Sequence, residues 1–139
     1  MRMVIKILAV ATLLVGIPSR CFAVWDVEIV TKERAKELGM EFRATAAGPK
    51  HVAVELEFTP VGELKNFSRV DLVLGKGDKT ELIAPLREDR SKPGRVVVRF
   101  TAERTHLDKL TLRVMVPGML GGSIHEVPVK EFVGLTNAR

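Results

Sequence analysis

The feature that most constrains the fold of this chain is a strict alternation of apolar and polar residues in short runs. Segment 51–58, HVAVELEF, places an apolar side chain at every second position and puts Glu55 and Glu57 between them. A period of two residues is that of a β-strand, whose successive side chains point to opposite faces of a sheet. The same pattern recurs at 25–30, 67–74, 95–100, 110–116 and 126–132. It indicates strands with one buried apolar face and one solvated face.

Segment 25–30, WDVEIV, is one such run. It puts Trp25, Val27 and Ile29 on one face of the strand, and Asp26 and Glu28 on the other. The general pattern predicts that the apolar face is the buried one.

Turn-forming residues separate these runs at short intervals. They occur at 47–50, 75–78 and 92–94 and are rich in glycine, proline and lysine. About seven short strands divided in this way predict an all-β fold, an antiparallel immunoglobulin-like β-sandwich. The chain contains no tyrosine, so it lacks the residue that often marks the corner between the two sheets of such a domain. The assignment therefore depends on the number and spacing of the strands.

Two segments depart from the strand pattern and predict one or two short helical turns. Residues 31–39 begin with Thr31, a suitable N-cap, continue with strong helix formers and end at Gly39. We expect a short helix here, leading into a strand over 38–45. Residues 102–110 predict a second helical turn that joins two strands.

The N-terminus predicts export from the cytoplasm. A short basic segment precedes an apolar run of about 11 residues, which fits the hydrophobic region of a signal peptide and is too short to span a bilayer. Small side chains at Cys21 and Ala23 favour cleavage after Ala23. Arg20 stands where a lipoprotein signal has a small residue, which disfavours lipidation of Cys21.

We therefore assign residues 1–23 to a signal peptide and residues 24–139 to one domain, periplasmic or secreted and without stable membrane insertion. The leader holds three of the 22 basic residues and none of the 17 acidic ones, so its removal lowers the net charge from +5 to +2. This small charge gives no support for binding to nucleic acid. The only cysteine leaves with the leader, which excludes disulfides and cysteine-based metal sites from the mature domain.

Sequence strings across nearly the whole domain carry a family resemblance. They are TKERAKELGMEFR, FSRVDL, SKPGRVVVRF, LDKLTLRVMV and the terminal VKEFV. Together they resemble a group of small secreted bacterial proteins of planctomycete type. The resemblance implies a location in the bacterial envelope or outside the cell, and it supplies no active-site residues.

No local pattern indicates catalysis. Glu55 and Glu57 share a strand face, but alternating acids are an ordinary way to keep such a face solvated. The segment 75–80, GKGDKT, lacks the spacing and the following helix of a phosphate-binding loop, so a hairpin turn is expected there. We expect a non-catalytic module without a cofactor, which binds a protein or another component of the cell envelope.

The segment 116–127, VPGMLGGSIHEV, is the most glycine-dense of the chain. Strands are expected on both sides of it, so we predict a hairpin in which Gly118, Gly121 and Gly122 supply positive φ angles.

A small copper carrier is the alternative function. Met115, Met119 and His125 follow one another along this predicted hairpin, and thioether and imidazole ligands suit Cu(I). Methionine is also a common flexible filler of apolar cores.

Two further sets of residues are candidates for contacts with a partner. Apolar side chains expected on outward strand faces or at a hairpin tip form the first set: Val73, Val97, Met119 and Leu120. Basic side chains of the charged loop 87–95 form the second set, which could contact an anionic glycan or lipid head group: Arg87, Arg90, Lys92 and Arg95.

Overall fold

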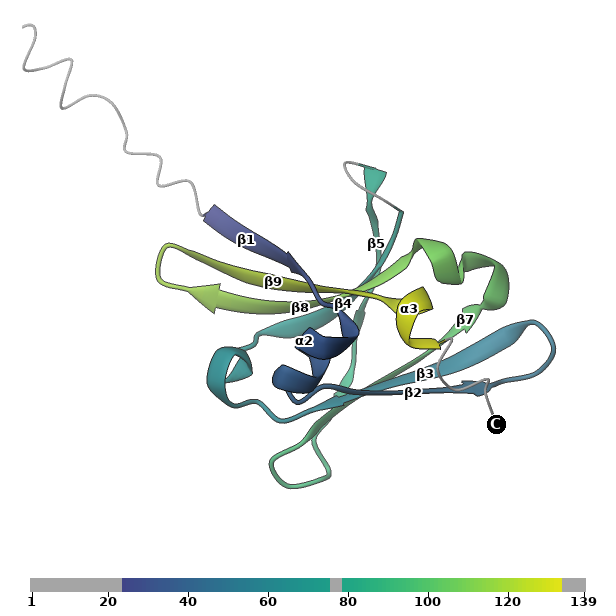
Figure 1. Ribbon diagram of the computed structural model, residues 1–139, viewed down its shortest axis with the longest axis horizontal. Coiled ribbons are helices and arrows are strands. Elements are labelled where there is room, and N and C mark those ends of the chain that lie inside the picture. The colour runs from purple at the N-terminus through teal and green to yellow at the C-terminus, as the bar shows by residue number, and fades with distance from the viewer. Residues whose placement is uncertain (1–23, 76–78, 134–139) are drawn as a thin grey trace, which may run out of the picture.

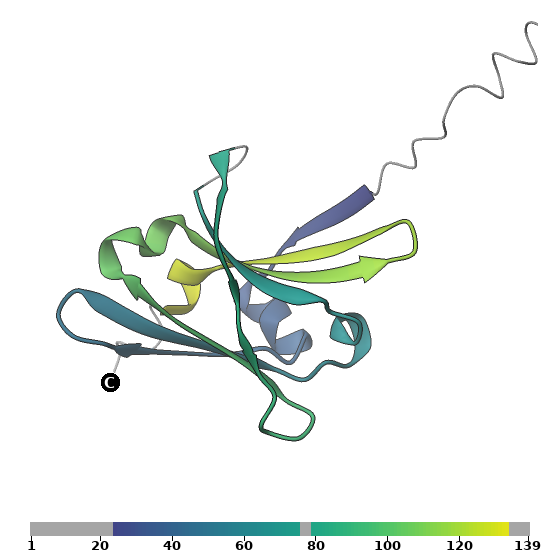
Figure 2. The ribbon, with the colours of Figure 1, turned by 180° about the vertical axis from the view of Figure 1, so that it is seen from behind.

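The computed structural model of the chain describes residues 24–75 and 79–133. This part is mostly β and forms two sheets with a few short helical segments (Figures 1 and 2). The predicted signal peptide at 1–23 lies outside the described residues, as do positions 76–78 of the predicted turn and the last residues, 134–139.

The first sheet has five strands in the order β1-β9-β8-β4-β5. Their bounds are β1 Val24–Ile29, β4 Arg69–Leu74, β5 Glu81–Leu86, β8 Leu110–Gly118 and β9 Gly121–Pro128. Neighbouring strands are antiparallel except for β1, which pairs with β9 in parallel. The prediction of a purely antiparallel sandwich is wrong at this edge. The first and last strands are far apart in sequence, so no hairpin turn imposes an antiparallel direction on them.

The second sheet has four strands in the order β2-β3-β7-β6, all antiparallel. Their bounds are β2 Glu41–Ala46, β3 His51–Phe58, β6 Glu88–Asp89 and β7 Val96–Glu103. The described residues thus contain nine strands, against the seven or so that were expected.

Short helical segments within the described residues connect or follow the strands: α2 Lys32–Glu37, η1 Gly62–Leu64, η3 Arg104–Lys109 and α3 Val129–Val133. The predicted start of the first helix is confirmed, because the Thr31 hydroxyl oxygen accepts a hydrogen bond from the backbone N–H of Arg34 at 3.2 Å. Its predicted end is confirmed by Gly39, which follows the C-cap with φ of +68°. The segment η3 lies where the second helical turn was expected.

The strand expected over 126–132 ends early. β9 stops at Pro128, and the chain continues as α3. There Phe132 packs against Phe42 of β2 with the ring centroids 4.3 Å apart. The local alternation missed this helix, because its apolar residues are buried against the opposite sheet.

The core lies between the two sheets, and alternate residues of their strands fill it. Leu56 and Phe58 of β3 and Leu112 and Val114 of β8 are all fully buried. The inward faces predicted for 51–58, 95–100 and 110–116 are confirmed by the burial of these residues and of Val96 and Val98.

The ends of the molecule are marked by two hairpins. The β8–β9 hairpin projects from one end with β1 beside it, and the β2–β3 hairpin projects from the opposite end (Figures 1 and 2). This arrangement leaves β1 as the outer strand of the first sheet.

Candidate interaction surface

β1 turns Val27 and Ile29 to solvent and Glu28 toward the rest of the molecule. Val27 and Ile29 are 57% and 65% exposed. Glu28, between them, contacts the buried His125. The predicted alternation is present, but the expected orientation of this strand is wrong, because its apolar face is the outer one.

The outward side chains of β1 continue into an apolar row across two neighbouring strands. Val27 lies opposite Ile124 of β9, and Ile124 lies opposite Met115 of β8. Ile124 and Met115 are half-buried, whereas the next residues along the two strands, His125 and Val114, are buried on the core side. We refer to the outward residues as the β1 surface: Trp25, Val27, Ile29, Met115 and Ile124.

A shallow pocket of about 310 Å³ adjoins the β1 surface beyond Ile29. Outward side chains of β8 and β9 line it, among them Thr111, Arg113 and Glu126, together with Leu107 of η3. Arg113 and Glu126 form an ion pair at 2.9 Å across the two strands. The apolar row thus ends against a polar rim, as interaction surfaces commonly do.

Two glycines of the β8–β9 hairpin allow β1 to lie close to it. A Cβ atom at Gly121 would overlap the backbone carbonyl of Val24, and one at Gly122 would overlap the carbonyl of Val116 and approach the ring of Trp25. Only Gly121, with φ of +146°, has the positive φ that was predicted for all three glycines. Close approach of neighbouring strands is thus the main reason for glycine at 121 and 122, and the prediction of a positive φ at Gly118 and Gly122 is wrong.

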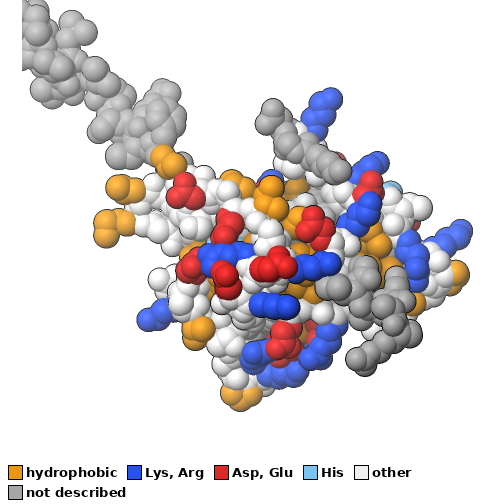
Figure 3. Space-filling model, viewed as in Figure 1, with side chains coloured by type: hydrophobic (Ala, Val, Ile, Leu, Met, Phe, Trp, Pro, Cys, Tyr) orange, Lys and Arg blue, Asp and Glu red, His pale blue; other side chains and the backbone are white. Residues whose placement is uncertain are grey.

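The inner face of β1 joins a polar network over α2. Oε2 of Glu28 accepts a hydrogen bond from Nδ1 of His125 at 2.9 Å, and Oε1 accepts one from Nε of Arg34 at 2.6 Å. Arg34 also donates to Glu63 at 2.6 Å and to Glu37 at 3.2 Å. Figure 3 shows acidic and basic side chains gathered over α2.

His125 is the buried member of this network, with 2% of its surface exposed. A carboxylate only accepts hydrogen bonds, so Nδ1 of His125 carries the proton that it shares with Glu28. Its other ring nitrogen, Nε2, is buried and has no hydrogen-bond partner within the described residues.

The charges of the network support one another. Hydrogen bonding to the Arg34 guanidinium is the largest cause that lowers the pKa of Glu28 below its ordinary value, and His125 contributes less, while burial opposes the shift. The pKa of Arg34 is raised, chiefly by its hydrogen bond to Glu28. Glu28 is therefore ionised at neutral pH, and charge-assisted hydrogen bonds hold β1 to α2.

Glu28, Glu63 and His125 have ligand atoms within 4.8 Å of one another, a spacing that could hold a metal ion. Arg34 already donates to both carboxylates at 2.6 Å. Its guanidinium supplies the positive charge that a cation would bring, so the arrangement is suited to linking β1 to α2 and η1.

The predicted copper ligands do not converge. Met115 is on the outer face of β8, opposite Ile124, whereas the neighbouring pair of the same ladder, Val114 and His125, faces the core. Met119 lies at the hairpin tip and is 99% exposed. Three side chains that point outward, inward and into solvent cannot surround one ion in this conformation.

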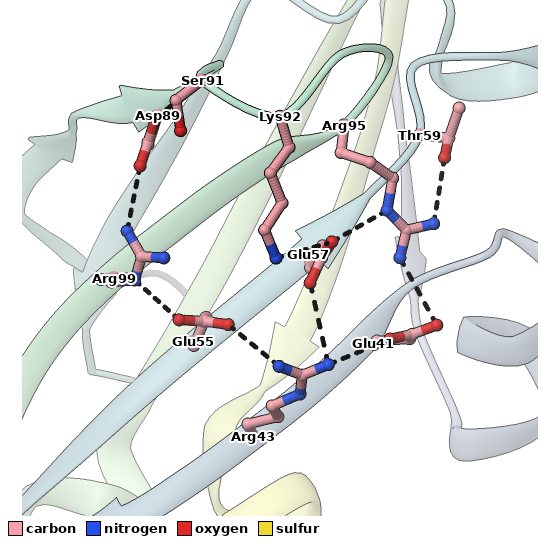
Figure 4. Close-up of polar contacts among 10 residues, drawn as sticks. All are labelled: Glu41, Arg43, Glu55, Glu57, Thr59, Asp89, Ser91, Lys92, Arg95 and Arg99. Atoms are coloured by element: carbon pink, nitrogen blue, oxygen red, sulfur yellow. Dashed lines mark hydrogen bonds and ion pairs between the residues drawn. The ribbon is translucent and has the colours of Figure 1, made fainter.

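Ion pairs cover the outer face of the second sheet (Figure 4). Glu57 is at its centre and is only 5% exposed, although its strand face is the outer one. Arg95 donates to it at 2.9 Å, and the ammonium of Lys92 lies 3.6 Å away. The hydrogen bond from Arg95 is the main cause that lowers the pKa of Glu57, with Lys92 assisting.

The same face pairs its remaining charges. Arg99 bridges Glu55 at 2.7 Å and Asp89 at 3.1 Å, and Arg43 lies 3.8 Å from Glu55 (Figure 4). The face therefore sets four cations against four carboxylates: Arg43, Lys92, Arg95 and Arg99, with Glu41, Glu55, Glu57 and Asp89. The charges of this ion-paired cluster balance, so it offers no excess of positive charge to an anionic ligand.

The candidate anion contacts are divided between two places. Lys92 and Arg95 meet at Glu57. Arg90 instead pairs with Glu88 at 3.0 Å and lies over the ring of Phe67, 5.1 Å from its centroid. Arg87 makes no ion pair within the described residues. The structure does not bring these four cations together as one site.

The candidate partner contacts also separate. Met119 and Leu120 are 99% and 76% exposed at the hairpin tip, but Val73 and Val97 are each only 2% exposed. The expectation that these two valines face solvent is wrong. Val97 lies between Glu57 of β3 and Asp89 of β6, and Val73 lies between Leu82 of β5 and Thr111 of β8. Each valine is short and is flanked on both sides by side chains of the neighbouring strands.

Comparisons with protein-family models, curated proteins and solved structures gave no match to this chain. Within residues 24–75 and 79–133, no helix is long and apolar enough to cross a membrane.

Proposed function

We propose that this chain is an exported, non-catalytic binding module of the cell envelope, and that a partner protein covers its β1 surface. The observation that carries this proposal is the reversed orientation of β1, which leaves Val27 and Ile29 more than half exposed. The leader-like segment 1–23 supports export.

The exposed side chains of β1 leave the isolated domain less stable than it would be with them buried. Burying a large aliphatic side chain stabilises a protein by about 1.5–3 kcal/mol relative to leaving it exposed. Val27 and Ile29 forgo part of this stabilisation in the free domain, and a partner that covers them would restore it. Their continuity with Ile124 and Met115 distinguishes this region from scattered exposed residues, which need no explanation.

The strand order supports an immunoglobulin-like sandwich. In the usual lettering of that fold, β2-β3-β7-β6 would be strands A, B, E and D, and β9-β8-β4-β5 would be G, F, C and C′. Many cell-surface binding domains use this architecture, although the fold alone does not specify a function.

Capture of the partner from the producing cell tests the proposal. The tagged chain and its Val27→Asp variant are exported, and the proteins that co-purify with each are compared. Thr45→Asp is the matched control, because Thr45 is an exposed β-branched residue on the second sheet. We expect a partner that binds the parent chain and the Thr45 variant but not the Val27 variant. Loss of the partner from the Thr45 variant alone would place the interaction elsewhere.

A further inference from the structure

We propose that the partner binds by adding an extended segment as a new strand along the free edge of β1, and that the side chains of this segment alternate between apolar and basic. This inference rests on the proposed function and specifies how the β1 surface is used. Three features of β1 support strand addition: its backbone, the side chains on its outer face and the charges on its inner face.

The backbone of β1 offers hydrogen bonds to a further strand. The N–H of Val24 donates to the carbonyl of Leu120 at 3.2 Å, and that of Val30 donates to Glu126 at 2.8 Å. In a parallel pair, residues that share this parity direct both backbone groups toward the neighbouring strand. Trp25, Val27 and Ile29 have the opposite parity, so their N–H and C=O groups point away from β9. Within the described residues no other strand pairs with β1.

The three residues with free backbone groups include the exposed Val27 and Ile29 and the half-buried Trp25. A strand that pairs with Trp25, Val27 and Ile29 places every second side chain on their outer face, about 4.5–5.5 Å between Cβ atoms. Apolar side chains there extend the row that already runs through Ile124 and Met115. Main-chain pairing combined with alternate side-chain contacts is the recognition mode of strand addition.

Acidic residues on and near the inner face of β1 favour basic side chains at the alternate positions of the added strand. Glu28, Glu37 and Glu63 share the single guanidinium of Arg34. Asp26 is exposed and makes no ion pair within the described part of the chain. β1, α2 and η1 together hold five acidic residues (Asp26, Glu28, Glu33, Glu37 and Glu63) and three basic ones (Lys32, Arg34 and Lys36). Basic side chains on an added strand would meet this excess of negative charge.

The same charges argue against a second copy of this chain as the added strand. Two copies of β1 paired antiparallel about Val27 would place Asp26 of one opposite Glu28 of the other. Like charges directly opposite each other destabilise a pair of strands. A partner with basic residues at these positions avoids this repulsion.

The test uses the protein purified after export from a bacterial host, labelled with ¹⁵N, and capped synthetic peptides of about seven residues. The first peptide alternates valine and lysine, the second alternates valine and glutamate, and the third has the composition of the first arranged in two blocks. We expect saturable binding of the first peptide, with the largest amide shifts at Trp25, Val27 and Ile29. The other two peptides should bind at least about tenfold more weakly, which corresponds to about one unit of pKd.

A backbone-modified peptide separates strand addition from simple adhesion. N-methylation of alternate residues of the valine–lysine peptide removes the donors on one edge and leaves every side chain in place. We expect binding to be lost when the methylated edge faces β1 and kept when the opposite edge is methylated. Asp26→Asn should reduce the preference for lysine over glutamate, while the exposed Glu81→Gln on β5 should leave it unchanged.

Equal binding of both methylated peptides, or shifts that fall outside β1, would overturn strand addition. The proposed function would survive that result, because the capture experiment with Val27→Asp does not depend on backbone pairing. A dimer of the chain alone whose interface includes β1 would also overturn the inference, since a second copy would then occupy the edge.

Discussion

At the scale of single residues, Glu28 is the side chain that connects β1 to the rest of the molecule. It accepts hydrogen bonds from His125 of β9 and from Arg34 of α2. A carboxylate with two such donors is best placed on the inner face, and the alternation of the strand then puts Val27 and Ile29 outside. The orientation of the β1 surface is thus coupled to the two polar contacts of Glu28.

Replacing Glu28 by glutamine should loosen β1. The amide keeps the length of the side chain but loses the charge-assisted bonds, and we expect the free energy of unfolding to fall by about 1 kcal/mol. Amide hydrogen exchange of β1 should accelerate more than that of β3. Glu37→Gln is the control, because Glu37 pairs with the same Arg34 on a more exposed side chain. An equal effect of the two substitutions would contradict the role given to Glu28.

The lowered pKa values of Glu28 and Glu57 predict how the free energy of unfolding depends on pH. The folded-state pKa values of Glu28 and Glu57 lie below their ordinary value of 4.5, so the unfolded state takes up these protons first as the pH falls. The two ionised carboxylates stabilise the folded state above about pH 4.5, and this stabilisation is lost as the pH falls through their folded-state pKa values. Urea titrations across this range should show a decline in the free energy of unfolding. The decline should be smaller in the Glu28→Gln, Glu57→Gln double variant, and an unchanged pH profile in that variant would contradict the assignment.

At the scale of elements, the contact between β1 and the β8–β9 hairpin depends on a glycine. Gly121→Ala would place a methyl group against the Val24 carbonyl, so we expect β1 to detach from β9 at its N-terminal end. Gly118→Ala is the matched control in the same hairpin, because its added Cβ would lie 3.6 Å from the nearest backbone oxygen and its φ is not positive. Amide exchange should rise across β1 in the first variant only. Protection that stays intact in Gly121→Ala would show that β1 is not held in this way.

The elements that could be predicted from the sequence are those whose local pattern leaves one choice. The inward face of β3 and the N-cap of α2 at Thr31 follow from spacing and residue type. The orientation of β1 does not, because the rule that the apolar face is the buried one holds for β3 and fails for this edge strand. Glu28, on the inner face of β1, forms hydrogen bonds with Arg34 and His125. The alternation within β1 does not predict these contacts with residues of α2 and β9.

The same limit applies to the candidate sites. Burial of Glu57 depends on Arg95, which is 38 positions away in the sequence. Met115 and His125 are close in sequence but lie on opposite faces of the hairpin, as the strand register determines. Exposure of Met119 and Leu120 could be predicted, since the tip of a hairpin has no neighbouring strand.

At the scale of the whole molecule, the ion-paired outer face of the second sheet contrasts with the β1 edge of the first sheet. The outer face of the second sheet pairs its cations and carboxylates internally (Figure 4). The first sheet has two edge strands, β1 and β5, and both expose apolar side chains. On β1, the exposed Val27 and Ile29 are also residues whose backbone groups point away from the sheet, and their row continues through Ile124 and Met115. On this basis we propose the β1 edge as the place where a partner binds.

The most direct test of the central claim, that a partner protein covers the β1 surface, is photo-crosslinking in the producing cell. A photoreactive residue is placed at Val27 and, in a separate strain, at Thr45 on the second sheet. We predict a discrete adduct from position 27 that is absent from position 45. A chain that gives no adduct at 27, or equal adducts at both positions, would contradict the account.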